Sequence, residues 1–327
     1  MSDSVLSLRD FTVSFPTLYG TVRAVRGLSL DVNPGEFVGV VGESGSGKSV
    51  TFLGMMGLLP KSAIVGGSAK INGEELVGAS NRKMRSVRGQ KISMIFQDPL
   101  SALNPVHRIG AQIEEMLGAH QSLSRQESER RVIELLDIVG IPQPDQRARQ
   151  FPHEFSGGMR QRVMIAMAIA NNPELLIADE PTTALDVTVQ AQILEVLERI
   201  RQELDTAIVL ITHDLGIVAR VVDRVEVMYA GRAVERATVA NLFDTPSHPY
   251  TVGLMRSLPA LGRERLEPIP GSPPNMLEPP PGCAFAPRCA HAQAACSAEI
   301  PDLREGRSGL TACIRSHELQ LEVGTRG

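Results

Sequence analysis

Short apolar runs alternate with longer helical patterns through most of this chain of 327 residues. The runs at 37–41, 175–178 and 207–211 are typical of strands that are buried on both faces of a parallel sheet. Each run is followed by polar or glycine residues and then by a helix-period pattern, which predicts an α/β core. The segment 68–76 carries Asn72-Gly73, a pair typical of hairpin turns, so we also expect some antiparallel sheet.

Between about 98 and 165 the pattern changes to helices alone. Ser124 and Glu127 have the spacing of a capping box at the start of a helix. The apolar positions that follow lie at i, i+3, i+4 and i+7: Val132, Leu135, Leu136 and Val139. The sequence therefore predicts a helical insertion within the α/β core.

Composition supports a globular chain without a membrane span of its own. Hydrophobic residues make up 43% of the chain and charged residues 21%, with a mean hydropathy of -0.02, which is too apolar for a disordered protein. No window approaches 18 consecutive apolar residues, and the N-terminus lacks the pattern of a signal peptide. The net charge of -4 indicates no general affinity for nucleic acid, and we expect no nucleic-acid partner.

Proline marks the domain boundaries that we predict. Nine of the 22 prolines lie between Pro259 and Pro287, where no regular helix or central strand is expected. We divide the chain into four parts. The α/β core with its antiparallel part comprises 1–97 and 166–240, and the helical insertion comprises 98–165. A proline-rich junction follows at 241–282, and a small appended module at 283–327.

A phosphate-binding loop follows the first apolar run. The pattern G-x-x-x-x-G-K-[ST] occurs between a predicted strand and a predicted helix, which is the context that this motif requires. Glycines allow the turn to aim backbone N–H groups at phosphate oxygens, and the helix presents its positive end. The candidate nucleotide-binding residues are Gly42, Glu43, Ser44, Gly45, Ser46, Gly47, Lys48, Ser49 and Val50.

Two carboxylates follow the second apolar run. Asp179 lies at the predicted end of the strand, where it would hold Mg²⁺ together with the hydroxyl of Ser49. Glu180 is next to it and is placed to polarise an attacking water molecule. Together with the loop, these residues predict a P-loop nucleoside triphosphatase with a RecA-like parallel sheet.

Together with further motifs, these residues stand in the order and spacing found in the nucleotide-binding subunits of ABC transporters, which the chain resembles. The match covers about 1–240 and includes Gln97, the Ser156-Gly157-Gly158 signature, Asp179-Glu180-Pro181 and His213. Phe155 and Met159 replace the common Leu and Gln that flank the signature. Within the family the chain is most similar to the ATPases of oligopeptide and dipeptide importers, through the segments 96–105, 179–190 and 248–251.

The resemblance implies roles for further residues. Gln97 would contact Mg²⁺ and the attacking water, and His213 would bond the γ-phosphate. Phe15 would stack on adenine, with Tyr19 as the rival candidate. Ser156, Gly157 and Gly158 would bind ATP held by a second ABC subunit in a head-to-tail dimer, since they open a helix with free N–H groups.

All four cysteines lie near the C-terminus, at Cys283, Cys289, Cys296 and Cys313. In a chain without secretion signals, clustered cysteines bind metal more often than they form disulfides, and four thiolates suit zinc or an iron–sulfur cluster. Zinc, a cluster or no metal all remain open from the residues alone. The resemblance to peptide importers implies a [4Fe–4S] cluster in this module.

The resemblance also predicts the setting. We expect a peripheral protein on the cytoplasmic face of the cell membrane, which couples ATP-driven dimerisation to transport by two transmembrane permease subunits. An extracytoplasmic substrate-binding protein would act with them indirectly. The alternatives are a related importer for nickel, glutathione or sugar, and a non-transport ABC ATPase.

Overall fold

The larger of two sheets carries all three of the predicted buried strands. The computed structural model describes residues 4–98, 102–183, 185–257 and 268–321, so the motif residues 99–101 and 184 lie outside it. In the described residues this sheet has the order β11-β12-β10-β9-β3-β8-β7-β6. Its parallel part consists of β3 (Phe37–Val41), β6 (Ile92–Ile95), β7 (Leu175–Asp179), β8 (Ala207–Thr212) and β9 (Arg224–Tyr229), and β10 (Arg232–Thr238), β12 (Gly309–Thr311) and β11 (Arg304–Glu305) continue it in antiparallel pairing.

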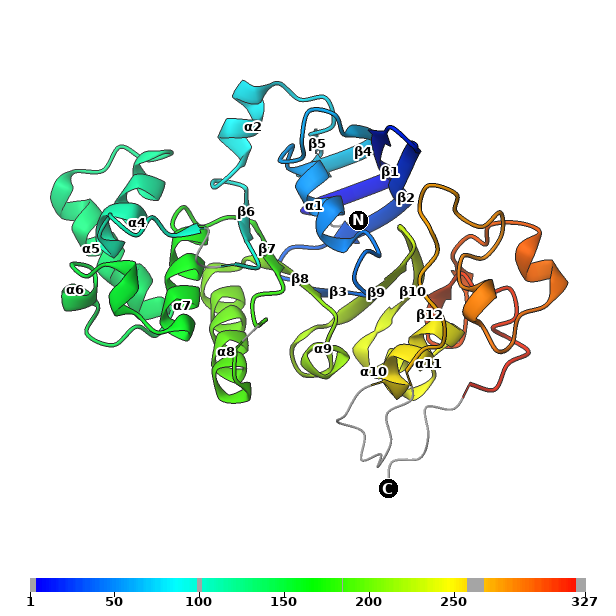
Figure 1. Cartoon of the computed structure of the whole chain (residues 1–327). Helices are drawn as coiled ribbons and strands as arrows, with labels where there is room; N and C mark the ends of the chain where they lie inside the picture. The colour runs from blue at the N-terminus through cyan, green and yellow to red at the C-terminus, as the bar shows by residue number, and fades with distance from the viewer. Residues whose placement is uncertain (1–3, 99–101, 184, 258–267, 322–327) are drawn as a thin grey trace.

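The smaller sheet is antiparallel and contains the predicted hairpin. Its order is β2-β1-β4-β5, formed by β1 (Leu6–Thr17), β2 (Gly20–Val32), β4 (Ile64–Ile71) and β5 (Glu74–Glu75). Ile71 pairs with Glu74 across the turn, and Asn72 and Gly73 adopt φ values of 48° and 78°, as a type I′ hairpin requires. Helix α1 (Lys48–Met55) lies between the two sheets and buries Phe52 and Met55 there (Figure 1).

The helical insertion is formed as the pattern predicts. It contains α4 (Ile109–Gly118), α5 (Arg125–Ile138), α6 (Pro144–Arg147), the short 3₁₀ helix η1 (Pro152–Glu154) and the first part of α7 (Gly157–Ala168). Both hydrogen bonds of the predicted capping box are present between Ser124 and Glu127, and the four predicted apolar positions of α5 and its C-terminus are buried. The domain boundaries themselves remain predictions.

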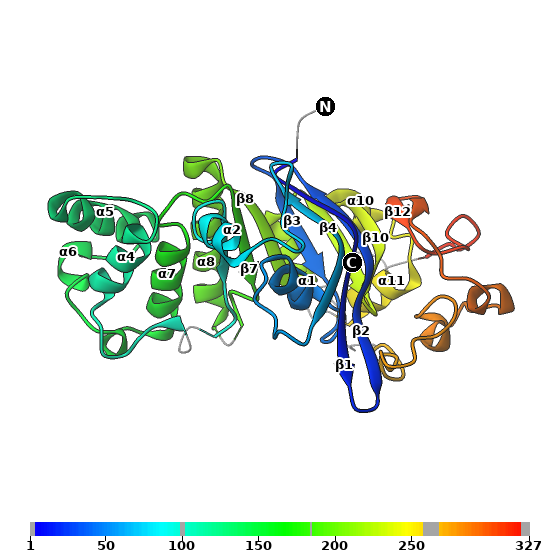
Figure 2. The ribbon, with the colours of Figure 1, turned by 90° about the horizontal axis from the view of Figure 1, so that it is seen from above.

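The remaining α-helices pack around the core sheet, and the C-terminal tail, residues 268–321, follows the last of them. They are α2 (Asn81–Val87), α8 (Val187–Leu204), α9 (Leu215–Val221), α10 (Val239–Asp244) and α11 (Pro249–Arg256). Apolar side chains of α8, α9 and α10 pack in one cluster with those of the larger sheet, on the face opposite α1. The helical insertion and the C-terminal tail lie at opposite ends of the molecule in both views (Figures 1 and 2).

The C-terminal tail continues the core sheet. Strand β12 pairs with β10, and the short 3₁₀ helices η3 (Ala286–Arg288) and η4 (Ala294–Ser297) precede it. Glu235 of β10 is fully buried and accepts hydrogen bonds from the N–H groups of Ser247 and His248, at 2.6 and 3.0 Å, and from the hydroxyl of Ser308. The tail is therefore tied to the core by a sheet edge and a buried carboxylate.

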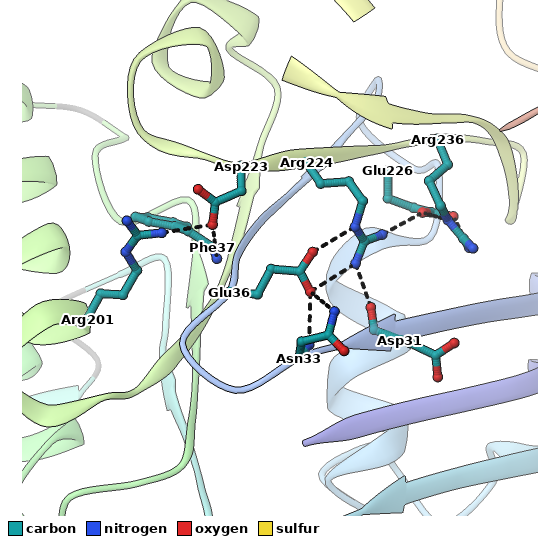
Figure 3. A network of polar contacts seen from close by, with 9 residues as sticks. All are labelled: Asp31, Asn33, Glu36, Phe37, Arg201, Asp223, Arg224, Glu226 and Arg236. Carbon is teal, nitrogen blue, oxygen red and sulfur yellow. Dashed lines mark hydrogen bonds and ion pairs between the residues drawn. The ribbon is translucent and has the colours of Figure 1, made fainter. Parts of the chain in front are cut away.

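A polar network joins the antiparallel sheet to the core (Figure 3). Arg224 donates to Glu36 at 2.8 Å and to the carbonyl of Asp31, at the end of β2, at 2.6 Å. Arg236 donates to Glu226 at 2.6 Å and also to a carbonyl of β2. Burial raises the pKa of Glu226, which is fully enclosed, and its pairing with Arg236 offsets part of that desolvation.

We expect Arg236→Ala to destabilise the fold by about 3–5 kcal/mol, because it leaves the buried carboxylate of Glu226 without its closest partner. Thermal and denaturant unfolding measure the change. Arg125→Ala is the control: it removes an exposed i,i+4 pair with Glu129 and should leave the unfolding midpoint unchanged. Equal effects of the two variants would show that the network does not hold the sheets together.

Candidate functional site

The loop between β3 and α1 is built around two glycines that approach other backbone closely. A Cβ on Gly42 would lie 2.2 Å from the carbonyl oxygen of Met228, and one on Gly47 would lie 2.5 Å from that of Ala24. Both adopt positive φ, 154° and 99°. A Cβ on Gly45, by contrast, would have no neighbour within 4 Å. The loop is therefore packed against the protein on one side and open at Gly45.

Lys48 and Ser49 begin α1 and are already engaged by groups of the loop and of β7. The Nζ atom of Lys48 donates to the carbonyls of Gly42 and Glu43 at 2.8 and 3.0 Å, and burial lowers the pKa of this amine. The hydroxyl of Ser49 donates to Asp179 Oδ1 at 2.7 Å, and burial raises the pKa of Asp179. These two oxygens are thus close enough to share one cation.

The loop also contains an unpartnered buried hydroxyl. The Oγ atom of Ser46 is buried and has no hydrogen-bond partner among the described residues. A buried polar atom without a partner is unfavourable, and a bound ligand is one way to satisfy it. With the amine of Lys48 and the open side at Gly45, this hydroxyl fits a loop that binds phosphate.

Three predicted catalytic residues meet at the carboxylate of Glu180. Gln97 Nε2 donates to Glu180 Oε2 at 3.0 Å, and His213 Nδ1 lies 3.2 Å from Glu180 Oε1. Thr183 donates to Oε2 at 2.9 Å. Sequence reasoning missed Thr183, although it stands three residues after Glu180 in the segment used for the resemblance.

Glu180 has an unusual backbone, and its site opens to solvent. Its φ of 46° lies in the left-handed region, where a residue other than glycine is strained. The Glu180 side chain is 19% exposed, whereas that of His213 is 63% exposed. Gln97, Glu180 and His213 therefore form a partly open cluster at the ends of β6, β7 and β8.

The Ser156-Gly157-Gly158 signature stands at the start of α7. Ser156 caps α7 and accepts a hydrogen bond from the N–H of Met159 at 3.3 Å. Ser156 and Gly157 are exposed, whereas a Cβ on Gly158 would lie 2.6 Å from a methyl group of Val189. In the part of the chain that the structure describes, no hydrogen bond joins the signature to the phosphate loop, so an exposed helix start faces outward.

The two candidate aromatic residues differ in their surroundings. Phe15 of β1 is partly buried and packs against the apolar cluster between the sheets. Tyr19 is 89% exposed in the turn between β1 and β2. Their predicted role toward adenine is not tested by these positions.

The four cysteines line one cavity, as a shared site requires, but the predicted iron–sulfur cluster is not supported. All four thiols are free, and the cavity measures about 20 Å³. Such a space holds about one water-sized sphere, whereas a cube of four irons and four sulfurs is much larger. Among the described residues, no group of three or more His, Cys, Asp or Glu side chains is placed to hold a metal ion.

Burial keeps most of these sulfurs in the thiol form. It raises the pKa of Cys283 and Cys289, and it raises that of Cys313 to about 11. Thiolates are the forms that bind metal, so the arrangement as it stands favours protonated cysteines at neutral pH.

Two residues to which sequence reasoning gave no role contact the phosphate loop. Arg288 binds the carboxylate of Glu43, and Tyr250 accepts a hydrogen bond from the N–H of the same residue. Tyr250 stands in the segment 248–251 that carried the resemblance, but no local pattern signalled its contact with residue 43.

The comparisons with known proteins agree with this geometry. The chain matches the family described as "ABC transporter" over residues 25–183, and the "Oligopeptide/dipeptide transporter, C-terminal region" over residues 234–296. It is 53% identical to the oligopeptide transport ATP-binding protein OppD of Bacillus subtilis, over 88% of this chain and 82% of that protein. The chain belongs to the oligopeptide and dipeptide transport ATP-binding protein family of ABC ATPases.

Further relatives cover nearly the whole of this ABC ATPase. OppD of Escherichia coli is 48% identical over 97% of this chain and 95% of its own length, and DppD of Bacillus subtilis is 50% identical over 91% and 90%. Members of the family hydrolyse ATP to drive transport, and the chain is such an ATPase.

Solved structures confirm the fold of the ABC ATPase. A dimeric post-hydrolysis structure of the ATP-binding cassette MJ0796, bound to ADP and Pi, matches with a TM-score of 0.64 and 26% identity, over 72% of this chain and 98% of that one. Within the described residues, no helix is both long enough and apolar enough to cross a membrane.

Proposed function

We propose that this ABC ATPase is the ATP-hydrolysing subunit of an importer for oligopeptides or dipeptides. The observation that carries the proposal is the meeting of Gln97 and His213 at Glu180, beside the Ser49–Asp179 pair. The peptide substrate is supported by the names of relatives that are 48–53% identical to the chain. A related importer for nickel, glutathione or sugar remains the alternative.

The phosphate loop would hold the β- and γ-phosphates of ATP through its backbone N–H groups. Lys48 would exchange the carbonyls of Gly42 and Glu43 for phosphate oxygens, because an ammonium group gains more from an anion than from two neutral acceptors. The unpartnered hydroxyl of Ser46 is available to the same ligand. Phe15 would stack on adenine, with Tyr19 as the rival.

The cluster at Glu180 would carry the hydrolytic step. Ser49 and Asp179 would hold Mg²⁺, together with Gln97, and a bound ion would neutralise charge on the phosphate oxygens. Glu180 would accept a proton from the attacking water. Hydrogen bonds from Thr183 and Gln97 would hold the carboxylate of Glu180 in position. His213, whose side chain is 63% exposed, would bond the γ-phosphate.

The signature implies a second subunit. Ser156 and Gly157 are exposed at the start of α7, where unpaired N–H groups and the helix dipole attract an anion. We infer that they bind ATP held by the phosphate loop of another ABC subunit, in a head-to-tail dimer. The partner is either a second copy of this chain or a related ATPase.

Replacing Glu180 by Gln should lower the rate of ATP hydrolysis at least about 100-fold, since the amide cannot accept the proton. ATP should still bind and should hold a dimer, which size-exclusion chromatography with Mg-ATP measures. Glu203→Gln, on the exposed face of α8, is the matched control and should hydrolyse ATP normally. Unchanged hydrolysis in Glu180→Gln would remove Glu180 from its role.

A groove between the core and the helical insertion is the proposed dock for a membrane partner. It has a volume of about 500 Å³ and is lined by five methionines, which adapt to irregular partners: Met56, Met94, Met116, Met164 and Met167. Phe96, next to Gln97, is 42% exposed at its edge, and Leu58 is 40% exposed. A segment bound here would contact β6 and α7 at once and would link the insertion to the catalytic cluster.

We infer that this occupant is an apolar cytoplasmic segment of a transmembrane permease subunit. The ATPase would then lie at the cytoplasmic face of the cell membrane. The extracytoplasmic substrate-binding protein would act on the other side, through the permease subunits.

Purification of the intact complex from membranes tests this docking. We expect two hydrophobic permease subunits to co-purify with the wild-type chain. They should not co-purify with Leu58→Glu, because burying an unpaired charge under the bound segment is unfavourable. Ile133→Glu places the same charge on α5 at 37% exposure and should retain them. Recovery of nucleic acid instead of permease subunits would overturn the transport function.

The [4Fe–4S] cluster remains a proposal that rests on the resemblance and on the shared cavity of the four cysteines. The cavity would have to widen, and the thiols would have to lose protons, for the cluster to form. A single Zn²⁺ ion needs less space and is the alternative.

Anaerobic purification followed by metal and sulfide analysis decides between these outcomes. A cluster predicts a brown protein with iron and acid-labile sulfide, both of which Cys296→Ser should reduce. Stoichiometric zinc in a colourless sample would show that the cysteines bind zinc instead of a cluster. A sample with neither iron nor zinc would show that the four cysteines are a buried group of thiols. Ser297→Ala, next to Cys296, is the control and should not alter the metal content.

A further inference from the structure

Glu43, the second residue of the phosphate loop, is held by residues that lie 207 and 245 positions later in the chain. The guanidinium of Arg288 donates to both carboxylate oxygens of Glu43, at 2.6 and 3.0 Å. This two-pronged geometry is the strongest form of an arginine–carboxylate contact. The C-terminal tail therefore reaches the loop that binds phosphate.

Contacts with groups other than Glu43 also hold the side chain of Arg288. Its side chain is 5% exposed, and it donates to the carbonyl of Pro270 at 2.9 Å and to the hydroxyl of Tyr229 at 3.2 Å. The guanidinium also lies over the rings of Tyr229 and Phe285, at 5.8 and 6.0 Å. The hydrogen bonds to Glu43 raise the pKa of Arg288, so the group remains charged.

Tyr250 fixes the main chain of the same residue. Its hydroxyl accepts a hydrogen bond from the N–H of Glu43 at 2.8 Å. The ring is buried against Tyr229 and Phe285, with centroids 4.6 and 5.3 Å apart. Because this N–H is taken, the phosphate-facing donors of the loop must come from the residues after Glu43.

We propose that Arg288 and Tyr250 are positioning residues for ATP binding. They hold the side chain and the N–H of Glu43, and so set the turn from which the following N–H groups and Lys48 face the triphosphate. The 3₁₀ helix η3 ends at Arg288 and is followed by Cys289. The contact between Arg288 and Glu43 therefore connects the cysteine-bearing tail to the nucleotide site. This inference rests on the ATP binding of the proposed function.

A double-mutant cycle on the full-length chain tests the inference. Arg288→Gln and Glu43→Gln should each raise the Kd for Mg-ATP and the KM by about five-fold or more, with a smaller change in kcat. The combined variant should be no worse than either single variant, because both remove the same contact. Arg288→Lys keeps the positive charge but cannot donate two parallel hydrogen bonds to the carboxylate of Glu43, and should bind ATP with intermediate affinity.

Two further variants separate positioning from folding. Tyr250→Phe keeps the ring but leaves the N–H of Glu43 unpaired, and should also raise the Kd. Asp302→Asn removes an exposed pair between the tail and Arg232 that does not touch the loop, and should bind ATP as the wild type does.

Additive effects of Arg288→Gln and Glu43→Gln, or a lower melting temperature of Arg288→Gln with an unchanged Kd, would overturn the inference. Additive effects would mean that Arg288 does not act through Glu43. An unchanged Kd with a lower melting temperature would mean that Arg288 serves the fold of the tail alone. Failure of the wild-type chain to bind Mg-ATP would instead contradict the proposed function. Wild-type binding with equal Kd in every variant would contradict the positioning role only.

Discussion

The parallel register of four neighbouring strands is the constraint on which the site depends. Val41 pairs with Thr212, Asp179 with Ile211, and Ile95 with Ala178, so β3, β8, β7 and β6 end at the same edge of the sheet. The segments that follow these ends carry the phosphate loop, His213, Glu180 and Gln97. Ligands of open α/β sheets bind at this edge. Here the register brings Ser49 to the carboxylate of Asp179, 130 positions later, and both Gln97 and His213 to the carboxylate of Glu180.

The same sheet supports backbone that would otherwise be unfavourable. Glu180 keeps a left-handed φ directly after β7 while its N–H still donates to the carbonyl of Ile211 at 2.9 Å. The loop glycines approach the backbone of Met228 and Ala24 more closely than any side chain would allow. Strain of this kind persists where the surroundings are rigid. The partly buried ion pairs of Figure 3 hold the antiparallel sheet against that core.

The sequence predicted the features whose signals are local. Apolar runs, the Asn72-Gly73 turn, the Ser124 capping box and the glycine loop each depend on a few adjacent residues, and the structure forms all of them. The contact of Gln97 and His213 with Glu180 could be predicted only through the resemblance. It depends on the order of β6, β7 and β8 in the sheet, which no local pattern of residues indicates.

Contacts between distant segments could not be predicted from the pattern. Arg288 and Tyr250 reach the loop across more than 200 positions, and β12 joins the core sheet through a short strand without a strong apolar pattern. The four cysteines were expected to share a site and do line one cavity, but spacing alone said nothing of its volume or of the protonation of the thiols.

A structure of the full-length chain with Mg²⁺ and a non-hydrolysable ATP analogue tests the central claim most directly. The account predicts that Lys48 leaves the carbonyls of Gly42 and Glu43 for the phosphates, while Ser49 and Asp179 flank one ion and Glu180 faces the γ-phosphate. A triphosphate bound elsewhere, with Lys48 still on the loop carbonyls, would contradict it.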